Sequence, residues 1–529
     1  MQRTLGAHLS HMLRDRGVEV IFGIPGVHNQ EMYRGIEEAG LRHVLARHEG
    51  GAGFMADGYA RATGRPGVAY VISGPGLTNV MTPMGQAYSD SVPMLVLSSV
   101  LDETAARRGQ LHQMRDQVGA ARTVCEWSEM AVTPQAAYAL IDRALQEMEL
   151  VRPRPRHICL PIAALQGNAA AFGPAPEGSA ARPGSDPALL AEAAARLATA
   201  VRPLIVLGGG AAAAPEAARA LVAKSGAAVF TTYAGRGLIA ADWPTSFGSF
   251  LARPGSADVF AQADLVIAIG TALSEVDLWR AHPGHSCPLI RIDIDPEELL
   301  SFPAVLRIAG DAGRAMEGIA AALPASRGPL WPVEDVAATK ATWRAQIAAE
   351  RPGILPVADA LRACLTPEAM IFSDMTQFAY ATLEVWEAPK PNLWHHPHGF
   401  GTLGYALPAA IGGAVGRPGL PTLAIAGDYG FQYTIQELAA AVELGLSLPI
   451  ILWDNGKLGE IEDSMVRAQI APNAVIQRNP DFLKLAEAYG ARSAAPQTLD
   501  AFQEAVREAL VAPVPTLIHA TPALGATSS

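Results

Sequence analysis

The chain has 529 residues and a formal net charge of −11, and its length predicts several domains rather than one. Charged residues make up 17% of it and apolar residues 50%, with 50 glycines and 40 prolines. An acidic chain lacks the basic surface that neutralises phosphates, which argues against a nucleic-acid binder, and the apolar content argues against disorder. This composition is typical of a large α/β protein whose parallel strands are buried on both faces.

The chain begins with MQRTLGAHLSHMLRDRG, the pattern of a short amphipathic helix that carries charges throughout. It has no apolar core of a signal peptide, and the uncharged stretches Pro66–Ser89 and Gly399–Gly416 are rich in Gly and Pro, unlike a membrane span. We therefore expect a cytoplasmic protein without a membrane partner. No zinc site or disulfide framework is expected, because the cysteines are widely scattered, at Cys125, Cys159, Cys287 and Cys364.

Short apolar runs alternate with helical patterns in three blocks, which predicts βαβ units and parallel sheets. The turn-rich stretches Ala163–Pro187 and Pro324–Pro332 separate the blocks. The expected domains are residues 1–165, 188–323 and 333–529. The expected strands are Val18–Phe22, Val68–Ile72, Met94–Ser98, Leu204–Leu207, Ala228–Thr232, Leu265–Ile269, Leu289–Ile294, Met370–Ser373, Thr422–Ala426, Pro449–Trp453 and Thr516–His519, and two of the expected helices are Gly50–Ala62 and Thr434–Gly445.

The first and third blocks share an order of landmarks. Each contains the motif GRPG, then a strand, a glycine-rich turn, a helix, and a proline that opens a further strand. The two sets lie about 350 residues apart, at Gly64–Gly67, Ser73–Gly76 and Pro93 and at Gly416–Gly419, Gly427–Gly430 and Pro449. This repetition predicts two copies of one fold around a different middle domain, although GRPG turns also recur by chance.

An acid stands in the glycine-rich turn of the third block, Gly427–Gly430. Glycines let a phosphate approach the backbone, but Asp428 would repel a bare phosphate unless a divalent cation bridged the two. The next strand ends in Asp-Asn-Gly, where the Asn455 side chain and the Lys457 carbonyl offer further oxygen ligands. The sequence therefore predicts a magnesium and phosphate site, with two ordinary strand-to-helix turns as the alternative.

A second acid, Glu49, begins a helix of small residues within RHEGGAGFMADGYAR (Arg47–Arg61). Small residues allow tight packing, and a buried carboxylate is costly unless it has a partner. Glu49 is therefore a candidate functional acid. The alternative is an ordinary acid that the helix dipole favours at the N-terminus of a helix.

Together, the segments FGIPG, RHEGGAGFMADGYAR, SGPGLTN, GTLGYALPAAIG, GDYGFQ and DNG resemble, in this order, the motifs of the thiamine-diphosphate enzymes of the acetolactate synthase, 2-oxoacid decarboxylase and benzaldehyde lyase superfamily. The resemblance spans almost the whole chain. It implies an α/β protein of three doubly wound parallel-sheet domains: a pyrimidine-binding domain, a Rossmann-like central domain and a diphosphate-binding domain, the outer two homologous. It also implies the cofactors thiamine diphosphate and Mg²⁺. A homodimer or homotetramer is implied as well, with active sites at the subunit interface.

The resemblance assigns roles to single residues. Glu49 would bind the aminopyrimidine ring, Leu403 would lie beneath the cofactor and bend it, and the Gly401 carbonyl would accept from the exocyclic amine. The implied cofactor contacts are Glu49, Gln377, Gly401, Leu403, Asp428, Tyr429, Gly430 and Asn455, and the implied metal ligands are Asp428, Asn455 and the Lys457 carbonyl. Tyr429 and Asp454 depart from the family's usual glycine and asparagine, which leaves a cofactor-free relative as an alternative.

The implied reaction is decarboxylation of a 2-oxo acid through a C2 ylide and an enamine, which is protonated to an aldehyde. The alternative is an acetolactate synthase-like or benzaldehyde lyase-like carboligase that forms or cleaves a 2-hydroxy ketone. His28 stands where benzaldehyde lyase has a histidine, so it is a candidate proton shuttle. His112 takes the place of a family glutamine and is a second candidate catalytic residue.

Within the superfamily, FGIPGVH, LHxxxDQ and GDYGFQ most resemble the 5-guanidino-2-oxopentanoate decarboxylases. A cationic substrate would need acids near the pocket, and Glu460, Glu462 and Asp463 are candidates, unless they form a solvated helix face. The middle block contains Gly208-Gly209-Gly210 without a full GxGxxG pattern, so we expect a structural domain and no FAD.

Overall fold

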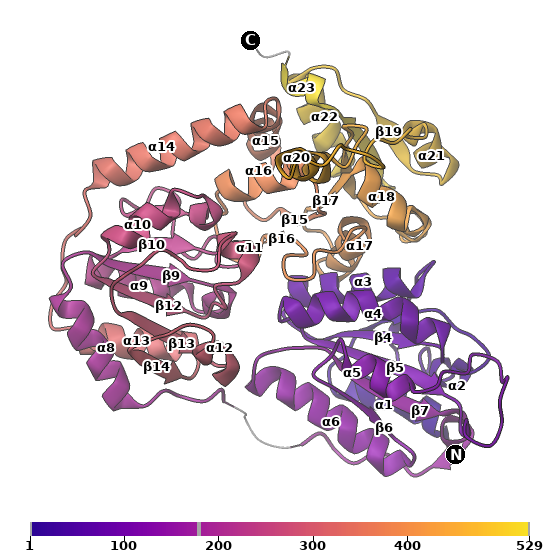
Figure 1. Ribbon diagram of the computed structural model, residues 1–529. Coiled ribbons are helices and arrows are strands. Elements are labelled where there is room, and N and C mark those ends of the chain that lie inside the picture. The colour runs from indigo at the N-terminus through magenta and orange to yellow at the C-terminus, as the bar shows by residue number, and fades with distance from the viewer. Residues whose placement is uncertain (1–2, 177–180, 527–529) are drawn as a thin grey trace. The chain divides into compact units, whose positions relative to one another are not determined.

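The computed structural model describes residues 3–176 and 181–526 (Figure 1). The described chain divides into two compact units. The first unit contains the described residues up to 176, together with 369–376 and 396–521; the second contains 181–368, 377–395 and 522–526. The chain carries three parallel sheets, as predicted for the fold class, and the domain boundaries at 165, 188, 323 and 333 stay predictions.

The N-terminal part of the first unit is a parallel sheet in the order β3-β2-β4-β5-β7-β6. Its strands are β2 (Val20–Gly23), β3 (Arg42–Leu45), β4 (Gly67–Val71), β5 (Met94–Val100), β6 (Trp127–Met130) and β7 (Arg156–Pro161). Its helices are α1 (Leu5–Asp15), α2 (Gln30–Tyr33), α3 (Glu49–Thr63), α4 (Pro75–Ser89), α5 (Gln117–Arg122), α6 (Pro134–Leu150) and α7 (Ile162–Gln166), and β1 (Arg3–Thr4) pairs antiparallel with β8 (Asn168–Ala169).

The C-terminal part of the first unit repeats this strand order. It contains the parallel series β15-β17-β18-β20-β19, which corresponds strand for strand to β2-β4-β5-β7-β6. The predicted internal repeat is therefore confirmed. The elements are β15 (Met370–Ser373), α17 (Ala406–Gly416), β17 (Thr422–Gly427), α18 (Asp428–Thr434), a 3-10 turn (Ile435–Glu437), α19 (Leu438–Glu443), β18 (Pro449–Trp453), α20 (Gly459–Arg467), α21 (Phe482–Ala488), β19 (Arg492–Ala494), α22 (Leu499–Ala509) and β20 (Thr516–Ala520).

The two repeats pack through α3 and α17, whose backbones touch. A Cβ at Gly58 would lie 1.9 Å from the Ala409 carbonyl oxygen, and a Cβ at Gly412 would lie 1.9 Å from that of Met55. The glycines are needed because only a residue without a side chain lets two helix backbones come this close. The small residues predicted to permit tight packing around Glu49 do so here.

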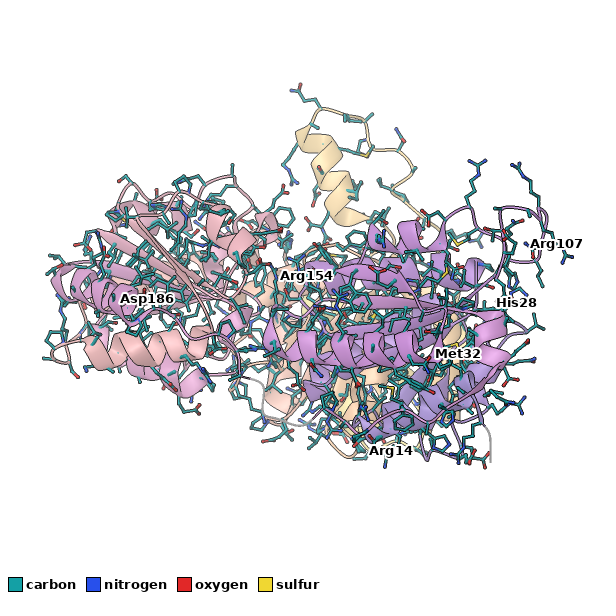
Figure 2. The ribbon with its side chains drawn as sticks, turned by 90° about the horizontal axis from the view of Figure 1, so that it is seen from below. Arg14, His28, Met32, Arg107, Arg154 and Asp186 are labelled. Carbon is teal, nitrogen blue, oxygen red and sulfur yellow. The ribbon has the colours of Figure 1, made fainter. Side chains whose placement is uncertain are left out.

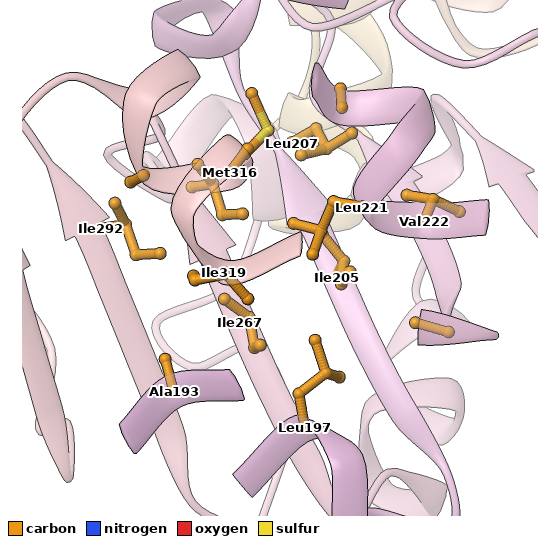
Figure 3. Close-up of a cluster of buried hydrophobic side chains, with 14 of the residues drawn as sticks. Ala193, Leu197, Ile205, Leu207, Leu221, Val222, Ile267, Ile292, Met316 and Ile319 are labelled. Atoms are coloured by element: carbon orange, nitrogen blue, oxygen red, sulfur yellow. The ribbon is translucent and has the colours of Figure 1, made fainter. Parts of the chain in front are cut away.

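The second unit is built on the sheet β11-β10-β9-β12-β13-β14, all parallel. Apolar side chains of β9, β12 and β13 pack against α8, α9 and α13 in one core (Figure 3). The strands are β9 (Pro203–Leu207), β10 (Ala228–Thr231), β11 (Ser246–Gly248), β12 (Leu265–Ile269), β13 (Leu289–Asp293), β14 (Leu306–Ala309) and β16 (Trp394–His395). The helices are α8 (Pro187–Thr199), 3-10 turns at Gly209–Ala211 and Phe250–Ala252, α9 (Pro215–Ser225), α10 (Ser256–Gln262), α11 (Glu275–Leu278), α12 (Pro296–Leu300), α13 (Ala312–Ala322), α14 (Val333–Glu350), α15 (Ile354–Cys364), α16 (Gln377–Val385) and α23 (Pro522–Ala526).

The strand order of the middle sheet reverses between β9 and β12, the usual place for a ligand crevice. There the glycine turns that follow the two strands bond to one another. The Gly208 N–H donates to the Ile269 carbonyl at 2.9 Å, and the Gly210 N–H donates to the Gly270 carbonyl at 2.9 Å. The glycines of this turn thus serve close backbone packing.

Two sequence predictions were wrong in detail. The stretch Ala163–Pro187 is not all linker, because its start belongs to α7 and β8, where Leu5 N–H donates to Gly167 O at 2.9 Å; residues 177–180 lie outside the described residues. The expected helix Thr434–Gly445 begins earlier, since α18 starts at Asp428, an acid that the N-terminal helix dipole favours. In the described ranges, no helix has both the length and the apolar character to cross a membrane.

Candidate active site

Two of the predicted catalytic residues meet at the carboxyl edge of the first sheet. His28 follows β2 and Ser73 follows β4, and these strands are neighbours. His28 Nδ1 lies 2.6 Å from Ser73 Oγ. His112, in the loop between β5 and α5, places its ring centroid 5.0 Å from that of His28 at an angle of 70°. Figure 2 labels His28 among the side chains of this unit.

His112 has a strained backbone. Its φ is +59°, a conformation uncommon for a residue with a side chain. Gly74 packs against it so closely that a Cβ at Gly74 would lie 2.4 Å from the His112 carbonyl oxygen. Its Nδ1 is buried and has no hydrogen-bond partner among the described residues. Such strain is characteristic of functional sites, so the geometry supports the choice of His112 as a candidate.

A cavity of about 220 Å³ adjoins His112. It opens between β5, the loop that follows it and α5, and both charged and apolar side chains line it. The lining includes Leu101, Asp102, Glu103, His112, Met114, Arg115, Asp116 and Met130. Of the two paired histidines, only His112 lines this cavity.

Glu49 is the first residue of α3 and is half-buried in the single chain. Its Oε2 accepts a hydrogen bond of 2.9 Å from Asn79 Nδ2 on α4. Its other carboxylate oxygen, Oε1, has no hydrogen-bond partner in the part of the chain that the structure describes. The segment SGPGLTN therefore holds two candidates at once: Ser73 binds His28 and Asn79 binds Glu49.

The carboxylate of Glu437 binds the backbone just before Glu49. It is fully buried and accepts the backbone N–H of Arg47 at 3.0 Å and that of His48. Burial raises the pKa of Glu437 to about 7, against the lowering effect of these hydrogen bonds. A Cβ at Gly51 would lie 2.2 Å from Glu437 Oε1, so the first turn of α3 lies directly on this carboxylate.

The predicted cofactor turn, Gly401–Gly404, is held by another buried carboxylate. Asp374 follows β15 and accepts the N–H groups of Met375 and Gly404, both at 2.8 Å. Burial raises the pKa of Asp374 to about 7. Gly401 is exposed with φ +64° and Leu403 is half-buried, so the turn presents both to solvent in the single chain.

The segment before this turn is fixed by the N-terminal repeat. Asp90 accepts the N–H of Gly399 at 2.8 Å, and Gln86 Oε1 accepts the hydroxyl of Thr402 at 3.0 Å. Asp90 also pairs with Arg61 at 2.8 Å. The position of the Gly401 carbonyl therefore depends on polar groups of both repeats.

The predicted metal ligands lie at the carboxyl ends of the neighbouring strands β17 and β18. Asp428 is buried as the first residue of α18, and Asn455 and Lys457 follow β18. Gly456 and Leu458 bond to the segment around Ile476, which leaves the Lys457 carbonyl outside that pairing. All three donors would offer oxygen, the ligand that Mg²⁺ prefers.

Asn479 was not predicted from the sequence, yet it touches both acids of this edge. Its Nδ2 donates to Asp428 Oδ2 at 2.7 Å and to Asp454 Oδ1 at 2.8 Å. Asp454, which replaces the usual asparagine, pairs through Oδ2 with His519 Nε2 at 2.8 Å. Asp454 thus has its own partner, His519, and its substitution for asparagine leaves the predicted ligands Asp428 and Asn455 present in the chain.

The other predicted contacts are placed as follows. Gly430 packs on Asp374, since a Cβ there would lie 2.8 Å from its carboxylate, and Tyr429 is half-buried with its ring centroid 5.5 Å from that of Tyr433. Gln377 begins α16 in the second unit. Glu462 forms an ion pair with Lys457, so it is less suited to hold a cationic substrate than the sequence suggested.

Among the candidates, His28 and Glu49 are linked through the segment Ser73–Asn79, and Asp428 and Asn455 follow the neighbouring strands β17 and β18. Within the described ranges, no hydrogen bond or ion pair joins Glu49 to Asp428. In those ranges, no three His, Cys, Asp or Glu side chains are arranged to hold a metal ion. Sequence reasoning missed Ser73, Asn79, Asp374, Glu437 and Asn479. Ser73 and Asn79 lie inside the motif SGPGLTN, and the other three lie outside the motifs named above.

Three family models match the chain. The N-terminal TPP binding domain of thiamine pyrophosphate enzymes matches residues 3–120, the central domain 190–319 and the C-terminal TPP binding domain 374–520. A probable 2-ketoarginine decarboxylase of Pseudomonas aeruginosa is 43% identical over 95% of this chain and 91% of its own. The acetolactate synthase isozyme 1 large subunit of Escherichia coli is 28% identical over 98% of this chain and 94% of its own, and an acetolactate synthase of Mycobacterium bovis is 30% identical over 93% and 83%.

Proposed function

The chain belongs to the thiamine pyrophosphate enzyme family, and from this premise we propose that it decarboxylates 5-guanidino-2-oxopentanoate, the 2-oxo acid of arginine, to the aldehyde one carbon shorter. That it is a thiamine-diphosphate-dependent 2-oxoacid decarboxylase follows from the family models and from the 43% identical relative. The choice of substrate rests on the name of that relative. The acetolactate synthases, at 28% and 30% identity, make a carboligase the weaker reading.

The donor groups fit thiamine diphosphate and Mg²⁺. Asp428, the Asn455 side chain and the Lys457 carbonyl would hold the metal, since they are oxygen donors at the ends of adjacent strands. Glu49, with one carboxylate oxygen engaged by Asn79, would hold the aminopyrimidine ring through the other. Gly401 and Leu403 lie exposed or half-exposed on a turn that Asp374 holds firmly.

When bound, thiamine diphosphate supplies the nucleophilic carbon that adds to the keto group and accepts the electron pair released with CO₂. The chain's own residues do the rest. Glu49 Oε1 would hold a proton against the ring nitrogen, which tunes the basicity of the cofactor's amino group. His28, with His112 beside it, would donate a hydrogen bond to the oxygen of the former keto group. The polar groups of Asp90, Gln86 and Asp374 hold the Gly401 turn rigid, so that its carbonyl is positioned in advance.

We place the complete site between two subunits, the Glu49 group of one with the Asp428 group of another, in a homodimer or homotetramer. The family resemblance supports this arrangement. The half-exposure of Glu49 and Leu403 and the exposure of Gly401 in the single chain agree with groups that a second chain covers.

The test is a substrate panel with pyruvate, benzoylformate and 5-guanidino-2-oxopentanoate, in the presence of thiamine diphosphate and Mg²⁺. We expect CO₂ and free aldehyde in equal amounts from the guanidino acid. Glu49→Gln should retain the fold and lose at least about a hundredfold in kcat, because it removes the acid that supports proton transfer. CO₂ from pyruvate with acetolactate in place of aldehyde would establish the carboligase instead.

A further inference from the structure

The burial of Ser73 decides whether its hydroxyl donates or accepts in the hydrogen bond with His28. Ser73 is fully buried at the end of β4, and its Oγ lies 2.6 Å from His28 Nδ1. No other partner of the Ser73 hydroxyl is found in residues 3–176 or 181–526. If His28 Nδ1 carried a proton, it would donate to Ser73 Oγ, and the hydroxyl hydrogen of Ser73 would be buried without an acceptor, which is costly. Ser73 therefore donates, and His28 Nδ1 accepts.

The serine is itself fixed by its neighbours. Its backbone N–H donates to Ser99 Oγ at 3.0 Å, and the N–H of Gly74 donates to Gln117 Oε1 at 3.1 Å. Gln117 Nε2 in turn donates to the Ser99 carbonyl at 2.8 Å. These groups are all buried, so β5 and α5 fix the backbone that carries the Ser73 hydroxyl.

His28 is held on its other side by His112. The two rings meet edge to face at a centroid distance of 5.0 Å. Burial, and next the charge of His112, lower the pKa of His28, which favours the neutral ring. A neutral ring whose Nδ1 accepts a hydrogen bond must carry its proton on Nε2.

We propose that Ser73 is a positioning residue that fixes His28 as the neutral Nε2–H tautomer, so that His28 enters the reaction as a hydrogen-bond donor through Nε2. The part His28 plays in the reaction rests on the proposed function. The tautomer itself rests only on the buried geometry. Ser73 touches neither substrate nor cofactor in this role and acts through His28.

The direct test reads the tautomer by NMR in full-length protein without cofactor, labelled with ¹⁵N at its 13 histidines. The His28→Gln spectrum identifies the His28 signals. We expect the wild-type protein to show a protonated Nε2 and an unprotonated Nδ1 at His28, and Ser73→Ala to show a mixture of both tautomers. A protonated Nδ1 in the wild type, or an unchanged tautomer in Ser73→Ala, would overturn the proposal.

Ser99→Ala is the matched control. It removes a buried hydroxyl from the same network but leaves the Ser73 hydroxyl in place, so it should keep the wild-type tautomer. In turnover, Ser73→Ala should lower kcat about tenfold with little change in KM. The reason is that only part of the His28 rings would then carry the Nε2 proton that donates the hydrogen bond. If the wild type turns over no acid of the panel, the proposed function fails, while the NMR result still decides the role of Ser73.

Discussion

At the scale of single residues, Asn479 lies between two carboxylates, those of Asp428 and Asp454. The two carboxylates share the Nδ2 donor of Asn479 and also the N–H of Gly456, at 3.0 and 3.1 Å. Burial raises the pKa of Asp428, and the charge of Asp454 raises it further. Without donors between them, two acids at one sheet edge would repel each other.

Asn479→Ala removes two charge-assisted hydrogen bonds from these acids. We expect the free energy of unfolding in EDTA to fall by about 2 kcal/mol. Excess Mg²⁺ with thiamine diphosphate should restore part of this loss, because a cation would replace the missing donor. The measurement is thermal unfolding of both proteins with EDTA and with Mg²⁺. An equal ligand-induced shift in wild type and variant would contradict the placement of the metal at Asp428.

At the scale of elements, the N-terminus of α3, which holds Glu49, is fixed by contacts with the C-terminal repeat. The fully buried carboxylate of Glu437, in the 3-10 turn after α18, accepts the N–H of Arg47 and packs against the first turn of α3. The helix then continues against α17 through Gly58 and Gly412. The orientation of Glu49 therefore depends on both repeats, and this packing explains how a helix with so many glycines forms despite their low helix propensity.

The buried Glu437 predicts a pH-dependent stability. Its pKa of about 7 in the folded chain lies above the ordinary value of 4.5. The folded chain therefore binds a proton more tightly than the unfolded chain, and the contribution of Glu437 to the free energy of unfolding falls as the pH rises from 4.5 to 7. By the linkage relation, the whole change is about 3 kcal/mol.

Glu437→Gln should flatten this decline, since the amide keeps an oxygen acceptor for the Arg47 N–H but does not titrate. Chemical denaturation at several pH values between 5 and 8 measures the slope. Asp374 and Glu384, whose pKa values burial also raises to about 7, contribute equally in both proteins and cancel in the comparison. Glu443→Gln on α19, an exposed site, is the control, and a slope unchanged in Glu437→Gln would refute the assignment.

At the scale of the whole molecule, one fold occurs twice, and each copy carries part of the proposed site. The N-terminal copy carries Glu49 and His28, and the C-terminal copy carries Asp428 and Asn455. Both groups lie at the carboxyl edge of a parallel sheet, where such folds bind ligands.

Mixing two inactive variants tests whether the halves combine across subunits. If each site joins the Glu49 group of one chain to the Asp428 group of another, a dimer of one Glu49→Gln and one Asp428→Ala chain has one intact site. Random assortment of equal amounts should then restore about a quarter of the wild-type activity. Sites formed within one chain would give none, and the homodimers of each variant provide the background.

Much of this could be predicted from the sequence. The buried strands, the repeat and the positions of Glu49, Asp428 and Asn455 were visible because apolar runs and glycine turns are local signals. The strand β7 was missed, because Arg156 and His157 interrupt its apolar run. His157 is buried there only because Ser98 and Ser128, from two other strands, bond it at 2.7 Å each.

The sequence by itself determined the fold class and the family, and it singled out Glu49 and Asp428 as candidate acids, since each depends on the type of residue at a short, fixed spacing. Only the tertiary structure decided which groups contact these candidates and their neighbours. Ser73 on His28, Asn79 on Glu49, Glu437 on Arg47 and Asn479 on Asp428 join residues 30 to 390 positions apart. Such pairs follow from where strands and helices end in space, because a hydrogen bond needs atoms within about 3 Å, and distance along the chain carries no record of that.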